Sequence, residues 1–177
     1  MTQSVVRYDY GFGVVGESRK HGARRSKPLL LVSANAALNV IGRALRYNAD
    51  GKTVGVDGTG AYAGILCGPK QYASRGTAAG GPLASTIVLP NNTLIEAVEF
   101  DYSLIVQLTN NNAAIGDYIV FATTGQIGAL QSVAAGAAVP ANTQQIHGAA
   151  VDDLPGNASG LCTISLTGPL VPSAAGV

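Results

Sequence analysis

The chain has 177 residues, enough for one domain with an additional segment or for two small domains. Apolar residues make up 47% of it, only 12% are charged, and 23 are glycine, a mixture typical of short strands joined by tight turns. No apolar run approaches the roughly 20 residues that a membrane span needs, which excludes such a span. The N-terminus lacks the apolar segment of a signal peptide, so we expect synthesis in the cytoplasm.

Positive and negative charges occupy different halves of the sequence. All eleven Lys and Arg residues lie at or before Arg75, together with four acids, a balance of +7. The remainder has six acids and neither Lys nor Arg, a balance of −6. Chance or a need for solubility would explain a weaker asymmetry, and this one indicates that the two halves face different surroundings.

The first 27 residues are predicted to form an extended arm, followed by a single folded domain over residues 28–177. The arm has scattered glycines and a basic cluster at 19–27 but no apolar face, so it cannot order itself by burial and is expected to bind something. The apolar run 28–32 then predicts a first buried strand.

The next segment is ambiguous between a helix and a hairpin. Residues 34–47 place apolar side chains near helical spacing, but Gly42 interrupts them and a turn follows, which favours a hairpin. The Gly-rich stretch 57–82 is predicted to be a long loop that carries Lys70 and Arg75, a second basic surface.

The second half contains the clearest strands. Apolar residues occupy every second position from Val98 to Leu108, the period of a β-strand. Further strands are expected at 86–89, 118–121, 129–133, 145–151 and 161–166, with 118–133 forming a hairpin around Thr124-Gly125. Short strands at regular spacing predict an all-β fold, a single small sandwich or barrel.

Residues able to carry out nucleophilic catalysis are few. Cys67 and Cys162 have no metal-ligand spacing and no local signature of a nucleophile, and Cys162 alternates with core positions, which favours buried free thiols over a disulfide. Of the two histidines, His21 lies in the arm and His147 on a predicted strand. A pairing of His147 with one of the thiols stays open, although a structural role for all of them is the stronger interpretation.

Acidic and glycine-rich motifs also favour structural roles. Glu99 and Asp101 alternate along the clearest strand, where they could serve acid–base chemistry or bind a cation but are more often a solvated face. The pattern Gly11-x-Gly13-x-x-Gly16 resembles a nucleotide loop, but neither a strand before it nor a helix start after it is present. No cluster has zinc spacing, so neither a metal nor a cofactor is expected.

The basic cluster at 19–27 is the most distinctive candidate for binding. Its Lys and Arg side chains could neutralise nucleic-acid phosphates or dock on an acidic protein surface. It lacks interleaved aromatic residues, which makes stacking on bases unfavourable.

Several short motifs resemble the head cement, or capsid decoration, proteins of tailed double-stranded DNA phages. They extend over residues 28–170: Asn39-Val-Ile-Gly-Arg-Ala44, Ala63-Gly-Ile-Leu-Cys-Gly-Pro-Lys70, Gly76-Thr77, Gly80-Gly81-Pro82-Leu83, Ile115-Gly-Asp-Tyr-Ile-Val-Phe121 and Leu166-Thr-Gly-Pro169. The resemblance implies a β-rich module, whether sandwich, barrel or β-tulip, that has no catalytic activity and no cofactor.

The same resemblance implies a homotrimer that sits at local three-fold positions on the capsid exterior and bridges major capsid subunits. Because of the charge asymmetry, we expect the basic half to face the shell and the acidic half to face outward, with membrane binding absent and nucleic-acid binding unfavoured. The expected capsid contacts are Arg19, Lys20, Arg24, Arg25, Lys27, Arg43, Arg46, Lys70 and Arg75.

Three other functions compete with this one. A small viral coat protein would use the basic arm to bind packaged genome, a tail or baseplate component would form a ring or spike, and a cysteine enzyme would depend on Cys67 or Cys162. The folded-domain position of several basic residues weakens the genome-binding alternative.

Overall fold

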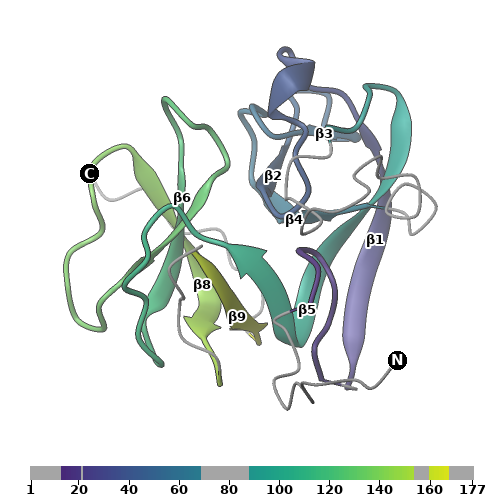
Figure 1. Cartoon of the computed structure of the whole chain (residues 1–177). Coiled ribbons are helices and arrows are strands. Elements are labelled where there is room, and N and C mark those ends of the chain that lie inside the picture. The colour runs from purple at the N-terminus through teal and green to yellow at the C-terminus, as the bar shows by residue number, and fades with distance from the viewer. Residues whose placement is uncertain (1–12, 21, 69–87, 154–159, 168–177) are drawn as a thin grey trace, which may run out of the picture.

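One long strand organises the molecule. The computed structural model describes residues 13–20, 22–68, 88–153 and 160–167. Strand β5 (Thr93–Gln107) spans 15 residues and runs through both halves of a single nine-stranded sheet. Figure 1 shows these halves as two lobes, with β5 passing from one to the other. The prediction of an all-β fold is confirmed.

The first half of the sheet closes into a ring. Its strands follow the order β1-β3-β2-β4-β5, and β1 also pairs with β5, which brings the ends of the row together. The members are β1 (Arg24–Leu31), β2 (Ala44–Tyr47), β3 (Thr53–Gly55) and β4 (Tyr62–Cys67). A 3₁₀ turn, η1 (Ala36–Leu38), precedes β2. The interior is apolar and includes Leu31, Leu45, Val54, Leu66, Leu89 and Ile95.

The second half continues from β5 in the order β5-β9-β8-β6-β7. Its strands are β6 (Tyr118–Ala122), β7 (Leu130–Val133), β8 (Thr143–Val151) and β9 (Leu161–Leu166). A bridge between Leu108 and Leu130 returns β7 to the end of β5. The Asn110 side chain completes this closure, since it accepts from the Ser132 N–H (3.0 Å) and donates to the Ser132 carbonyl (3.0 Å).

Most of the predicted strands are present. The structure confirms the strand over 98–107, the 118–133 hairpin, and the strands near 145–151 and 161–166. Residues 34–47 contain the 3₁₀ turn η1 and then β2, and β2 pairs with β3 to form the hairpin that was predicted over a helix. Of the strand expected at 86–89, residues 86 and 87 lie outside the described residues.

Two boundaries differ from the prediction. Residues 62–67, predicted to lie in a loop, form β4, in which Ala63 is the extra residue of a bulge and the neighbouring Gly64 has a φ of +140°. A Cβ on Gly64 would lie 2.9 Å from the Val98 carbonyl oxygen, so only glycine fits this close approach. Strand β1 begins at Arg24, within the segment predicted to be an arm, because its polar residues pair with acids on β5.

Candidate interaction surface

A segment near the N-terminus lies along β5. We call residues 13–20 the N-terminal strap. Three hydrogen bonds hold its backbone: Gly16 N–H to the Ile105 carbonyl (2.9 Å), Ile105 N–H to the Glu17 carbonyl (2.9 Å) and Arg19 N–H to the Ser103 carbonyl (2.8 Å). This part of the predicted arm is therefore bound to the domain, whereas residues 1–12 lie outside the described residues. The division into an arm and a domain stays a prediction.

An apolar contact fixes the strap beside β2. Val15 is buried, and its side chain packs on Gly42, which has a φ of +90°. A Cβ at residue 42 would lie 2.4 Å from the Val15 Cγ1. Gly42 therefore supplies both the backbone conformation and the space that the strap needs.

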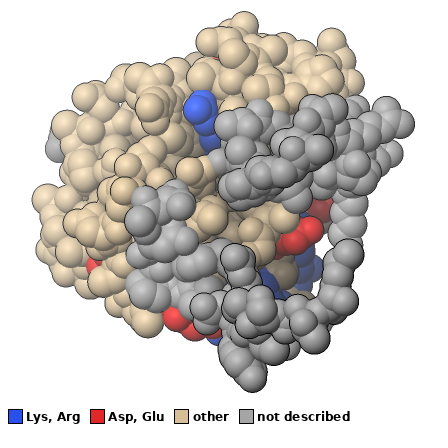
Figure 2. All heavy atoms as spheres, in the orientation of Figure 1, with Lys and Arg blue, Asp and Glu red and all other residues tan. Residues whose placement is uncertain are grey.

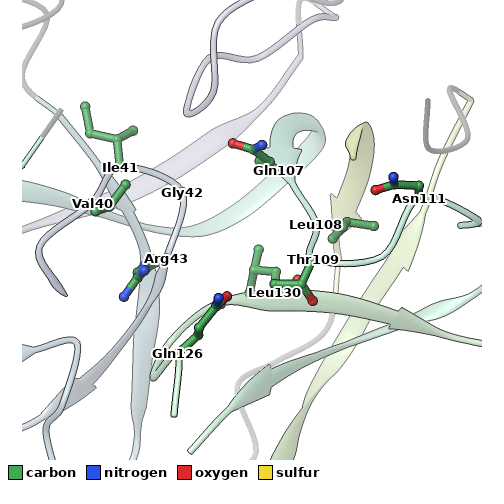
Figure 3. Close-up of a pocket in the computed structure, with 11 residues that line it drawn as sticks. Val40, Ile41, Gly42, Arg43, Gln107, Leu108, Thr109, Asn111, Gln126 and Leu130 are labelled. Atoms are coloured by element: carbon green, nitrogen blue, oxygen red, sulfur yellow. The ribbon is translucent and has the colours of Figure 1, made fainter. Parts of the chain in front are cut away.

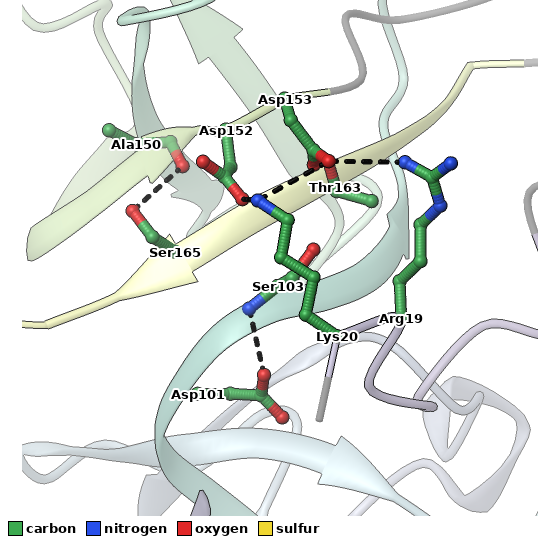
Figure 4. Close-up of polar contacts among 9 residues, drawn as sticks. All are labelled: Arg19, Lys20, Asp101, Ser103, Ala150, Asp152, Asp153, Thr163 and Ser165. Atoms are coloured by element: carbon green, nitrogen blue, oxygen red, sulfur yellow. Dashed lines mark hydrogen bonds and ion pairs between the residues drawn. The ribbon is translucent and has the colours of Figure 1, made fainter. Parts of the chain in front are cut away.

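Ion pairs fasten the end of the strap to the second half of the sheet. Arg19 Nη1 lies 3.2 Å from Asp153 Oδ2, and Lys20 Nζ lies 3.0 Å from Asp152 Oδ2 and 3.3 Å from Asp153 Oδ2. The Thr163 hydroxyl donates to Asp153 Oδ1 at 2.9 Å. Figure 4 shows Lys20 reaching both carboxylates and Arg19 reaching Asp153. Burial acts to raise the pKa of Asp153, but Thr163 and the two cations outweigh it and hold that pKa below its usual value.

A second set of charges joins β1 to β5. Glu99, which is 4% exposed, accepts a hydrogen bond from Arg25 Nε (3.1 Å) and pairs with Lys27 Nζ. The hydrogen bond that Lys27 itself donates to Glu99 raises the pKa of Lys27. Arg24 pairs with Glu96 at 3.5 Å. Basic residues from the N-terminal region thus neutralise acids that lie more than 70 residues away in the sequence.

Asp101 is the second buried carboxylate of β5. It is 1% exposed, accepts from the Ser103 N–H at 2.9 Å, and also accepts from the hydroxyl of Ser18 in the strap. Arg24 Nε lies 4.0 Å from Asp101 Oδ2. The carboxylate therefore ties the strap, β1 and β5 together.

The burial of Glu99 and Asp101 corrects the expectation of a solvated face. In the β1–β5 pairing, Arg25 lies opposite Phe100 and Ser26 opposite Val98, so Glu99 is the extra residue of a bulge. A bulge interrupts the alternation of a strand and re-aims the side chain, here toward the cations of β1. No sequence signal marks this bulge. On the face drawn in Figure 2, acidic and basic side chains lie next to one another in the lower part, and most of the described surface is uncharged.

The nine residues predicted to contact a capsid have different surroundings. Five of them, Arg19, Lys20, Arg24, Arg25 and Lys27, form the ion pairs described above. Arg43 and Arg46 bind backbone carbonyls instead: Arg43 Nη1 donates to Ile127 (3.0 Å), and Arg46 donates to Gly60 and Thr59 (both 2.9 Å). Lys70 and Arg75 lie outside the described residues. Any contact through the first five must compete with pairs inside the chain.

The residues considered for catalysis are not arranged for it. Cys67 and Cys162 are free and buried, and burial raises the pKa of each thiol to about 12. A thiol with such a pKa is a poor nucleophile at neutral pH. His147 is exposed on β8, and across the described part of the chain no hydrogen bond joins it to either thiol. The described residues also contain no group of His, Cys, Asp and Glu able to hold a metal ion, and no helix long and apolar enough to cross a membrane.

Comparisons with known proteins show which family the chain belongs to and which solved structure has a similar fold. The family model of the structural cement proteins, described by E217 gp24 and Pam3 gp6, matches residues 1–167. Among curated proteins, none matches the sequence. A chain from a solved structure, described as the capsid of Myoviridae phage XM1, is 13% identical, with a TM-score of 0.59 over 94% of this chain and 97% of that one. At this identity the likeness concerns the fold alone.

Proposed function

Since the chain belongs to the structural cement proteins of phages, we propose that it binds the exterior of the capsid shell and holds neighbouring major capsid subunits together. The observation that carries this proposal is the family match, which covers residues 1–167 and so includes the strap and all the strands through β9. In this role the protein acts by binding alone, without catalysis or a cofactor. Its location is the virion, and its synthesis takes place in the host cytoplasm.

The strap, β1 and β5 form a rigid unit that suits this role, and we call this unit the clamp. The strap, β1 and β5 are tied by backbone hydrogen bonds and by buried carboxylates with several partners each. A preorganised protein loses less conformational entropy on binding, so more of its contact energy appears as affinity. We assign Arg19, Lys20, Arg24, Arg25 and Lys27 to this clamp in addition to their expected place near the shell.

A homotrimer at local three-fold sites is the assembly we propose. Three copies of one modest contact gain affinity by multivalency, which suits a protein whose described surface carries little unpaired charge. Arg43, Arg46, Lys70 and Arg75 are the cations that we retain as shell contacts.

Binding to mature, undecorated heads tests the proposal. Purified protein is added to such heads and the particles are imaged, with the protein alone imaged as the control. We expect added density at local three-fold positions with the basic residues toward the shell. Shells formed by the protein alone would support a coat protein, and rings or spikes a tail component. Heads that stay bare would contradict the proposal.

A further inference from the structure

A pocket opens where the two halves of the sheet meet. Its volume is about 440 Å³, and three segments line it: 40–43 ahead of β2, 107–111 at the end of β5, and 126–130 leading into β7. Figure 3 shows Arg43 on one side of this space, Gln126 below it, and Thr109 and Leu130 toward the other side. The same junction is held by the Ala44 N–H, which donates to the Gly128 carbonyl at 2.9 Å.

Among the described residues that line the pocket, Arg43 is the only cation, and no described acid balances its charge. Its guanidinium donates to the Ile127 carbonyl at 3.0 Å, and within the described residues no carboxylate forms an ion pair with it. Burial lowers the pKa of this guanidinium, so the group has lost part of its hydration without gaining an anion. By contrast, the five cations of the strap and β1 all have acidic partners.

The chemistry of the lining selects among anions. A guanidinium has five N–H donors in a planar fork that matches a carboxylate with two parallel hydrogen bonds. One guanidinium balances the single charge of a carboxylate but not that of a phosphate monoester, which approaches −2. Ile41 and Leu130 also line the pocket and offer apolar contact to the methylene groups of an acidic side chain.

We propose that this pocket binds the carboxylate of an Asp or Glu side chain presented by the capsid shell. The inference rests on the proposed function, which supplies the protein that presents the acid. The carboxylate accepts from the free N–H groups of Arg43, and its stem packs on the apolar part of the lining. The junction between the two halves thereby becomes a specific anchor, in contrast to a diffuse basic face.

Four versions of the full-length protein test the proposal by their affinity for undecorated heads: the wild type, Arg43→Gln, Gln126→Glu and Lys52→Gln. Arg43→Gln removes the cation, and Gln126→Glu keeps Arg43 but places a competing negative charge at the rim. Lys52→Gln is the matched control, because it removes one positive charge from an exposed residue outside the pocket. Thermal unfolding checks that each variant is folded.

We expect Arg43→Gln and Gln126→Glu to weaken binding about ten- to hundredfold, the effect of losing a charge-assisted hydrogen-bonded pair, and Lys52→Gln to change it less than threefold. If Arg43→Gln does not fold, the affinity of Gln126→Glu for undecorated heads alone tests the pocket. Unchanged binding by Gln126→Glu, or equal losses with Lys52→Gln, would overturn the pocket while leaving the proposed function intact. Failure of the wild type to bind would instead overturn the proposed function.

Discussion

Arg25 and Lys27, the two cations that face Glu99, are predicted to contribute more to the free energy of unfolding than any exposed ion pair among the described residues. Glu99 is 4% exposed and has Arg25 and Lys27 as its charged partners among the described residues. Replacing both by Gln leaves a buried carboxylate without a counter-charge, a change that typically costs about 3–5 kcal/mol. Because the two cations are themselves half exposed or more, we expect the lower end, about 3 kcal/mol.

Urea or thermal unfolding at pH 7 measures this cost. A loss of about 3 kcal/mol corresponds to a fall in Tm of roughly 6–12 °C for a domain of this size. Adding Glu99→Gln to the double variant removes the unpaired charge and is expected to restore more than half of the loss, since a neutral amide is cheaper to bury.

The control is the variant with Arg19→Gln and Lys20→Gln. It loses the same charge, but its partners Asp152 and Asp153 are 28% and 35% exposed, so water can replace the pairs and we expect a clearly smaller loss of stability. Equal losses in the two double variants, or no recovery with Glu99→Gln, would refute the reasoning from burial.

Three further predictions concern the strap and the thiols. Gly42→Ala forces a side chain against Val15 at a φ that alanine avoids, so we expect the strap to detach and trypsin to cleave after residues 19 and 20 at least tenfold faster than in the wild type. The pKa of Asp153 in the folded protein lies below its usual 3.8, so the stability that its ion pairs contribute is complete above pH 3.8 and is lost as the pH falls through that lowered pKa. After correction for intrinsic rates, amide hydrogen exchange in the strap should therefore stay constant from pH 5 to 7 and accelerate only in the acidic range where Asp153 becomes protonated. Cys67 and Cys162, with pKa values of about 12, should resist a thiol reagent at pH 7.5 in the folded protein and react in denaturant; fast labelling of either in the folded state would revive the cysteine-enzyme hypothesis.

Local sequence patterns were sufficient to predict where the strands lie, but they were insufficient to predict which polar side chains are buried and what they pair with. The alternation from Val98 to Leu108 predicts β5 because strand periodicity depends on neighbouring residues alone. The burial of Glu99 depends on a bulge and on the pairing of β5 with β1, whose cations Arg25 and Lys27 lie more than 70 positions before Glu99. Pairing between such distant segments leaves no trace in composition.

The charge asymmetry shows the same limit. Basic residues gather before Arg75 and acids after it, which indicates separate surroundings for the two halves. In the fold the two sets meet, since the strap carries Arg19 and Lys20 onto the carboxylates that follow β8. The pocket at Arg43 was equally hidden, because three segments far apart in sequence create it.

The central claim, that the protein cements a capsid, is tested most directly by the temperature at which mature heads release their DNA. Undecorated heads are heated with and without saturating protein, and release is followed with a dye that binds DNA. A ligand that binds the intact shell but not its separated subunits must stabilise it, so we predict a higher release temperature that rises with protein concentration until the sites are filled. Heads that bind the protein and release DNA at the same temperature as bare heads would contradict the account.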